Sequence, residues 1–166
     1  DKAYVFIDII KAAGGLPVGT QPKLVCLLKG DMSSAVACWM TMKRGCPPIL
    51  INFQEDADAE RNLKRALEAS QKLLEWAIGF PRRLYVVEPS REFVLAIEKH
   101  PSELRDLLSR RFMRHVAGHL AHRWGAEGIV TGDSLRNGAF QSLHVFRIEN
   151  EATGDLLASC VTPIAP

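Results

Sequence analysis

The feature that most constrains the fold is a short, unbroken apolar run from Lys23 to Leu28. Such a run is typical of a β-strand that is covered on both faces, since a half-exposed strand would alternate apolar and polar residues. The run ends in a polar loop, 29–34, and a helical pattern follows. Further strands are expected at 49–53, 84–88, 128–131 and 156–161.

Amphipathic segments separate these strands and predict helices. The first is expected over 34–44, with Ser33 or Ser34 as its N-cap and Gly45 as its C-terminal stop. Other helices are expected from the acidic turn 54–60 to near 79, and over 91–99, 102–124 and 138–146. Strands that alternate with helices predict an α/β fold, a Rossmann-like three-layer α/β/α sandwich with a mostly parallel five-stranded sheet.

The first twenty residues differ from the rest of the chain. Residues 3–10 are rich in β-forming side chains and predict an N-terminal strand. The segment "GGLPVGT", 14–20, combines glycine and proline and predicts a connector. We therefore expect a division into 1–20 and a domain over 21–166.

Composition excludes some classes of protein. The net charge of +2 is too small to indicate nucleic-acid binding by itself. No apolar run reaches the length of a membrane span, so no membrane partner is expected and a cytoplasmic location fits. Cys26 and Cys38 fall in apolar patterns and are expected in the core, and the four cysteines have no C-x-x-C spacing.

In a parallel sheet, ligands bind beyond the carboxyl ends of the strands. The loops of interest are therefore 29–34, 54–58 and 132–141. In the first loop, Gly30 lets the backbone approach a ligand, Lys29 supplies positive charge, and Ser33 and Ser34 supply hydroxyls at a helix N-terminus. Asp31 works against an anion there. A plain capped turn explains the same pattern, and neither a Walker A motif nor G-x-G-x-x-G is present.

Several motifs together resemble one family. "LLKGDMSSAVACWMTMKRGC" resembles the PP-loop segment, S-G-G-x-D-S, of the tRNA 4-thiouridine synthetase and thiamine-biosynthesis sulfurtransferases. "RRFMRHVAGHLAHRWGAEGIVTGDSL" resembles the family's helix, strand and T-G-E-S-L loop, and "ATGDLLASCVTPI" its following strand. "GGLPVGT" resembles its connector, and "DKAYVF" the end of its preceding THUMP domain.

The resemblance implies an adenine nucleotide α-hydrolase-like, PP-loop ATP-pyrophosphatase domain over 21–166. Its cofactors would be ATP and Mg²⁺. Its chemistry would be adenylation of a tRNA uridine with pyrophosphate release, after which sulfur displaces AMP. The implied partners are ATP or AMP, tRNA, a THUMP-containing chain and a sulfur-donor protein.

The resemblance also assigns residues to ATP binding, at strand ends, in the first loop and on one helix. They are Leu27, Leu28, Lys29, Gly30, Ser33, Ser34, Asn52, Phe53, Arg110, Gly132 and Gln141. No catalytic residue and no protein-bound metal are assigned.

Departures from the family pattern lie in the same loop. Lys29 stands in place of the motif's serine, Asp31 of its second glycine and Ser33 of its aspartate. The family's sulfur-carrying cysteines lie beyond the end of this sequence, so sulfur transfer by this chain alone is not expected. The alternatives are a catalytically inactive nucleotide-binding relative and an RNA-binding or assembly module.

Three further features have a functional and a plain interpretation. His115, His119 and His122 share one arc of the helix 102–124, with a solvated face preferred over a metal site. Asp56, Asp58 and Glu60 suit magnesium, or simply begin a helix. The same long helix is basic, which suits RNA or plain solvation, through Arg105, Arg110, Arg111, Arg114 and Arg123.

Overall fold

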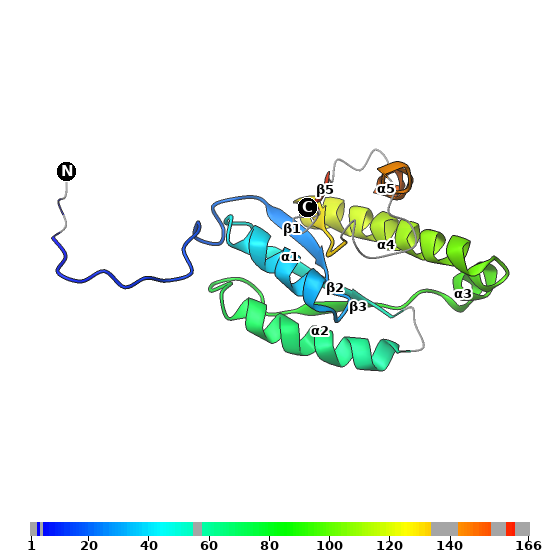
Figure 1. Cartoon of the computed structure of the whole chain (residues 1–166), viewed down its shortest axis with the longest axis horizontal. Helices are drawn as coiled ribbons and strands as arrows, with labels where there is room; N and C mark the ends of the chain where they lie inside the picture. Colours follow the sequence, from blue (N-terminus) through cyan, green and yellow to red (C-terminus); the bar gives the residue numbers. More distant parts are fainter. Residues whose placement is uncertain (1–2, 4, 55–57, 134–142, 154–158, 162–166) are drawn as a thin grey trace.

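The structure is a computed structural model, and it describes residues 3, 5–54, 58–133, 143–153 and 159–161 (Figure 1). Its elements agree with the predicted alternation of strands and helices. In chain order they are β1 (Lys23–Leu27), α1 (Met32–Met42), β2 (Pro48–Phe53), α2 (Ala59–Leu74), β3 (Leu84–Val87), α3 (Arg91–Glu98), α4 (Ser102–Trp124), β4 (Ala126–Val130), α5 (Leu143–Asn150), the 3₁₀ turn η1 (Glu151–Thr153) and β5 (Ser159–Val161).

The sheet has five strands in the order β3-β2-β1-β4-β5, and every described pairing is parallel. This confirms the predicted α/β fold and sharpens the expected, mostly parallel sheet. The chain leaves β1 for β2 on one side and later returns to β4 on the other. The strand order therefore reverses between β1 and β4, which is the crevice where such sheets bind ligands.

Successive residues of β1 point to opposite faces, so each face has its own core. On one face, Cys26 and Leu28 pack with side chains of α1 and α2, including Cys38 and Ala66. On the other, Val25 and Leu27 pack with side chains of α4. Figure 1 shows α1 and α2 on one side of the sheet and α4 on the other, which confirms the three layers.

The N-terminal strand predicted over 3–10 is absent from the described residues of that segment. They are exposed and extend away from the sheet (Figure 1), with Val5 97% and Ile7 96% accessible. β-forming side chains favour a strand only where another strand can pair with them, and no described strand lies beside this segment.

Other differences lie at the ends of elements. α2 stops at Leu74 and not near Gly79, since a turn with Gly79 at φ +88° follows. β3 is less buried than predicted, with Val86 44% exposed, because it lies at the edge of the described sheet. The helix predicted over 138–146 is described only from 143, and runs on to Asn150.

No helix among the described residues is long and apolar enough to span a bilayer.

Candidate functional site

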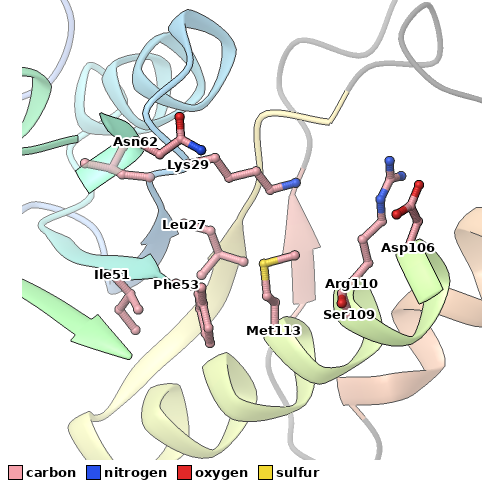
Figure 2. A pocket seen from close by; sticks show the side chains of 10 residues that line it. Leu27, Lys29, Ile51, Phe53, Asn62, Asp106, Ser109, Arg110 and Met113 are labelled. Carbon is pink, nitrogen blue, oxygen red and sulfur yellow. The ribbon is translucent and has the colours of Figure 1, made fainter. Parts of the chain in front are cut away.

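A cavity of about 260 Å³ lies at the carboxyl ends of β1 and β2, against one face of α4 (Figure 2). Leu27, Phe53 and Met113 give it an apolar floor, and the cationic ends of Lys29 and Arg110 lie to one side of that floor in the view. The lining residues are Leu27, Leu28, Lys29, Ile51, Phe53, Asn62, Asp106, Ser109, Arg110 and Met113. A cavity that combines an apolar floor with polar and charged groups beside it suits an organic ligand that carries an anionic group.

The structure brings together five of the residues that the sequence assigned to ATP binding. They are Leu27, Leu28, Lys29, Phe53 and Arg110. Five other assigned residues lie around this site without lining it: Gly30, Ser33, Ser34, Asn52 and Gly132. Gln141 lies outside the described residues.

The side chain of Asn52 is buried and holds two strands together. Its side chain is 1% accessible, and its amide Nδ2 donates a hydrogen bond of 2.6 Å to the backbone oxygen of Leu28. The backbone N–H of Leu28 donates to the oxygen of Ile51 at 2.8 Å. Asn52 therefore fixes the end of β1 against β2, which holds the floor of the cavity in place.

Asp31, and not Ser33 or Ser34, caps α1. Its backbone is extended, and its carboxylate Oδ1 accepts a hydrogen bond of 2.9 Å from the backbone N–H of Ser34. Aspartate is among the best N-caps, since its charge also favours the positive end of the helix dipole. The prediction failed because Asp31 was considered only for its effect on a bound anion, and not as a cap.

Gly132 allows the end of β4 to approach the start of α1. A Cβ at this position would lie 2.6 Å from the carbonyl carbon of Ser33 and closer still to the backbone nitrogen of Ser34. These neighbours are backbone atoms, which cannot turn away as a side chain can. The sequence selected this glycine as a ligand contact, and the structure shows a packing reason for it.

An ion network centred on two buried side chains, Arg114 and Glu149, joins the β1 and β4 loops to α4 and α5. Lys29 Nζ lies 3.1 Å from Asp133 Oδ1, and Arg114 lies 2.8 Å from Asp133 Oδ2. Arg114 also lies 2.6 Å from Glu149 Oε2, and Arg110 lies 3.3 Å from Glu149 Oε1. The two carboxylates alternate with three cations across the crevice between β1 and β4.

This network bears on the prediction that the basic residues of α4 contact RNA or are simply solvated. The side chain of Arg114 is 2% exposed, so it cannot contact RNA at the surface. Arg110 pairs with Glu149, and Arg111 donates to the backbone oxygen of Ile148. Helical periodicity placed Arg114 among exposed arginines because its partners are far away in the sequence.

The ionisation of Asp133 makes the stability of the fold depend on pH. Burial raises the pKa of this carboxyl, but the nearby charges of Lys29 and Arg114 outweigh burial and hold the pKa below its ordinary value of 3.8. A lowered pKa means that ionised Asp133 stabilises the fold above the unfolded pKa, and that this contribution is lost as the pH falls through the folded pKa.

We therefore expect Asp133→Asn to lower the free energy of unfolding most near neutral pH. The difference from the natural protein should shrink as the pH falls below about 4, since Asp133 is then protonated first in the unfolded state and, below its lowered pKa, in the folded state as well. Urea unfolding of both proteins at several pH values measures it. A difference that stays constant across this range would contradict the ionised pairing.

Five lining residues were not assigned from the sequence: Ile51, Asn62, Asp106, Ser109 and Met113. Asp106, Ser109 and Met113 lie on the same face of α4 as Arg110, at i, i+3, i+4 and i+7. This helical spacing could have identified these three residues from the sequence once Arg110 had been assigned to the site. Asn62, from the first turns of α2, gives no such signal.

The predicted metal candidates have other contacts. Nδ1 of His115 lies 3.2 Å from the backbone oxygen of Ala152, and Nε2 of His115 lies 3.2 Å from Nε2 of His119. Asp58 pairs with Arg61 at 2.9 Å, and Asp56 lies outside the described residues. Within the described part of the chain, no three histidine, cysteine or carboxylate side chains are grouped to hold a metal ion.

Comparisons with known proteins agree on one family. A model described as "Thiamine biosynthesis protein (ThiI)" matches residues 19–160. A probable tRNA sulfurtransferase of Thermococcus kodakarensis is 36% identical over 156 residues, which are 92% of this chain and 40% of the relative. A second, from Brevibacillus brevis, is 38% identical over 145 residues, covering 86% of this chain and 36% of the relative.

A solved structure gives the same result. It is the crystal structure of a 4-thiouridine synthetase–RNA complex with bound ATP, with a TM-score of 0.81 and 27% identity over 94% of this chain and 40% of that chain. This chain thus spans two-fifths or less of the length of these relatives. The family match over most of the chain, together with the fold, shows that this chain belongs to the thiamine biosynthesis protein (ThiI) family and corresponds to its PP-loop ATP-pyrophosphatase domain.

Proposed function

We propose that this chain is an adenine-nucleotide-binding domain that serves tRNA 4-thiouridine synthesis. The observation that carries the proposal is the cavity beside the β1–β4 crevice, where an apolar floor lies next to two cations, Lys29 and Arg110. The adenine and ribose rings would lie against Leu27, Phe53 and Met113. Lys29 and Arg110 would then bind phosphate oxygens, and arginine suits this role through its planar set of donors.

The relatives support the nucleotide and the RNA as partners. The similar 4-thiouridine synthetase structure holds both RNA and ATP. For a protein of this kind, the proposed reaction is adenylation of a tRNA uridine with release of pyrophosphate, followed by sulfur transfer from a donor protein. A THUMP-containing segment and the sulfur-carrying cysteines would complete that reaction, and residues 1–20 would lead from the former into the domain 21–166.

The residues described near the cavity do not fit a protein-bound magnesium site. Asp133 already pairs with two cations and Asp31 caps α1, which leaves Asp106 as a single carboxylate in the described lining of the cavity. Magnesium would therefore enter only with the phosphates of ATP, and we assign no ligand to it and no step through it.

One observation favours the alternative of a nucleotide-binding relative that does not catalyse adenylation. The carboxylate of Asp31 occupies the start of α1, where the PP-loop of the family is glycine-rich. An RNA-binding module receives less support, because Arg110, Arg111 and Arg114 all have partners within the chain. Magnesium-dependent release of pyrophosphate from ATP, measured with tRNA in the complete protein, separates the catalytic from the binding role.

We expect Arg110→Ala to weaken binding of AMP by roughly 10- to 100-fold, since a hydrogen bond to a charged group contributes about 1.5–3 kcal/mol. Glu149 keeps Arg114 as a partner at 2.6 Å, so the fold should tolerate the change. Isothermal titration calorimetry measures the affinity.

The matched control is Arg123→Ala, since Arg123 is an exposed arginine near the end of the same helix and far from the cavity lining. It should leave the affinity unchanged. Equal binding by the natural protein and by Arg110→Ala would remove Arg110 from the site. Absence of binding of both ATP and AMP to the natural protein would overturn the nucleotide proposal.

A further inference from the structure

We infer, on the basis of the nucleotide site proposed above, that Asp31 makes this site selective for adenosine monophosphate and adenosine over nucleoside triphosphates. The family's loop has a glycine where this chain has Asp31. The side chain that replaces it fills the anion position at the start of α1. The inference concerns which part of a nucleotide the chain can hold, and it assigns a specificity-determining role to one residue.

The backbone donor that a terminal phosphate would use is already bound. The N–H groups of the first turn of a helix have no partners within the helix, and phosphates commonly bind there. In this chain the N–H of Ser34 donates to the Asp31 carboxylate at 2.9 Å. The carboxylate thus holds the position of an anion, and its charge repels a second one.

The side chains of the loop are also engaged. The hydroxyl of Ser34 donates to the backbone oxygen of Asp31 and accepts from the N–H of Lys29, both at 3.2 Å. Lys29 Nζ is paired with Asp133 at 3.1 Å. These donors of Lys29 and Ser34 therefore have partners within the chain, and a triphosphate that bound to them would have to break those contacts.

The charge around the cavity agrees with this. Three cations and three carboxylates lie in or beside the cavity, so their formal charges balance. The cations are Lys29, Arg110 and Arg114, and the carboxylates are Asp106, Asp133 and Glu149. A triphosphate carries several negative charges, which this surrounding would not neutralise. One phosphate, in contrast, can be met by the remaining N–H donors of Lys29 and Arg110.

The size of the cavity points the same way. Its volume of about 260 Å³ lies just below the roughly 300–1,000 Å³ typical of small-molecule pockets. Asp31 itself lies on the other side of the loop, beside Gly30 and Met32 at the groove between α1 and α2. A nucleoside with one phosphate would contact Lys29 and Arg110 and leave the Asp31 cap in place, whereas the further phosphates of ATP would extend from Lys29 along the loop toward Asp31.

The test is calorimetric titration of ATP, AMP and adenosine into the natural protein, with and without magnesium. We expect AMP to bind more tightly than ATP, and magnesium to change this ratio less than threefold. ATP binding as tightly as AMP, or more tightly, would overturn the inference and still support the proposed nucleotide site. Absence of binding of all three would overturn the proposed site and the inference with it.

Two substitutions at position 31 test the role of the residue. Asp31→Gly restores the family's residue and frees the N–H of Ser34, so we expect it to raise the ATP affinity at least tenfold relative to AMP. Asp31→Asn removes the charge but keeps a side-chain cap, so its gain should be smaller. If Asp31→Gly unfolds the domain, Asp31→Ser, another capping residue, replaces it. An unchanged ratio of ATP to AMP affinity in folded variants would overturn the inference.

Discussion

Replacement of Arg114 by alanine is expected to lower the free energy of unfolding by roughly 3–5 kcal/mol, the usual cost of breaking a buried ion pair from one side. Arg114 is 2% exposed and lies 2.8 Å from Asp133 and 2.6 Å from Glu149. Its removal leaves Glu149, which is 3% exposed, with the longer contact to Arg110 as its ion pair among the described residues. The desolvated charge of that carboxylate then dominates the cost.

Thermal unfolding measures this effect directly. For a domain of this size each kcal/mol corresponds to roughly 2–4 °C, so the melting temperature should fall by about 6–20 °C. Arg123→Ala, an exposed arginine of the same helix, is the matched control and should move the melting temperature by little. Equal shifts in the two variants would contradict a buried role for Arg114.

A second comparison separates the charges from the packing. Arg114→Met fills similar space without a charge, and Glu149→Gln removes the charge of its partner. The double variant should be more stable than the sum of the two single losses predicts, since each single change leaves an uncompensated charge. Additive losses would instead indicate that Arg114 stabilises the fold mainly through the contacts of its aliphatic chain.

The main elements of the fold could be predicted because their signals are local. The continuous apolar run at 23–28 identified a covered strand, and Gly125 marked the end of α4 with a left-handed backbone at φ +64°. The strand predicted over 3–10 failed because strand formation requires a neighbour, which the sequence of a segment does not specify.

The candidate site could be predicted only in part, for the same physical reason. Lys29 and Phe53 were found because ligands gather at the carboxyl ends of parallel strands. The ion network was not, since Arg114 and its partners are 19 and 35 residues apart in the sequence. A buried arginine and an exposed one share the same helical spacing until the partners from β4 and α5 are placed.

Gly30→Ala is expected to destabilise the fold by roughly 2–5 kcal/mol and to disturb the cavity. The backbone of Gly30 has φ +81°, a region that costs an L-residue about 1–2 kcal/mol. A Cβ at this position would also overlap the backbone oxygen of Asn62 and lie 3.0 Å from its Cα. Overpacking of this kind costs roughly 1–3 kcal/mol more, because backbone atoms of α2 have to move.

Gly79→Ala separates the two contributions. Gly79 has a similar φ of +88°, but a Cβ there would meet nothing within 4 Å. It should therefore lose only the conformational part, about 1–2 kcal/mol, in urea unfolding. Asn62 also lines the cavity (Figure 2), so only Gly30→Ala should weaken AMP binding. Equal losses of stability in the two variants would show that α2 does not pack against the β1–α1 loop as closely as the structure has it, and the wall of the proposed nucleotide site would then have to be redrawn.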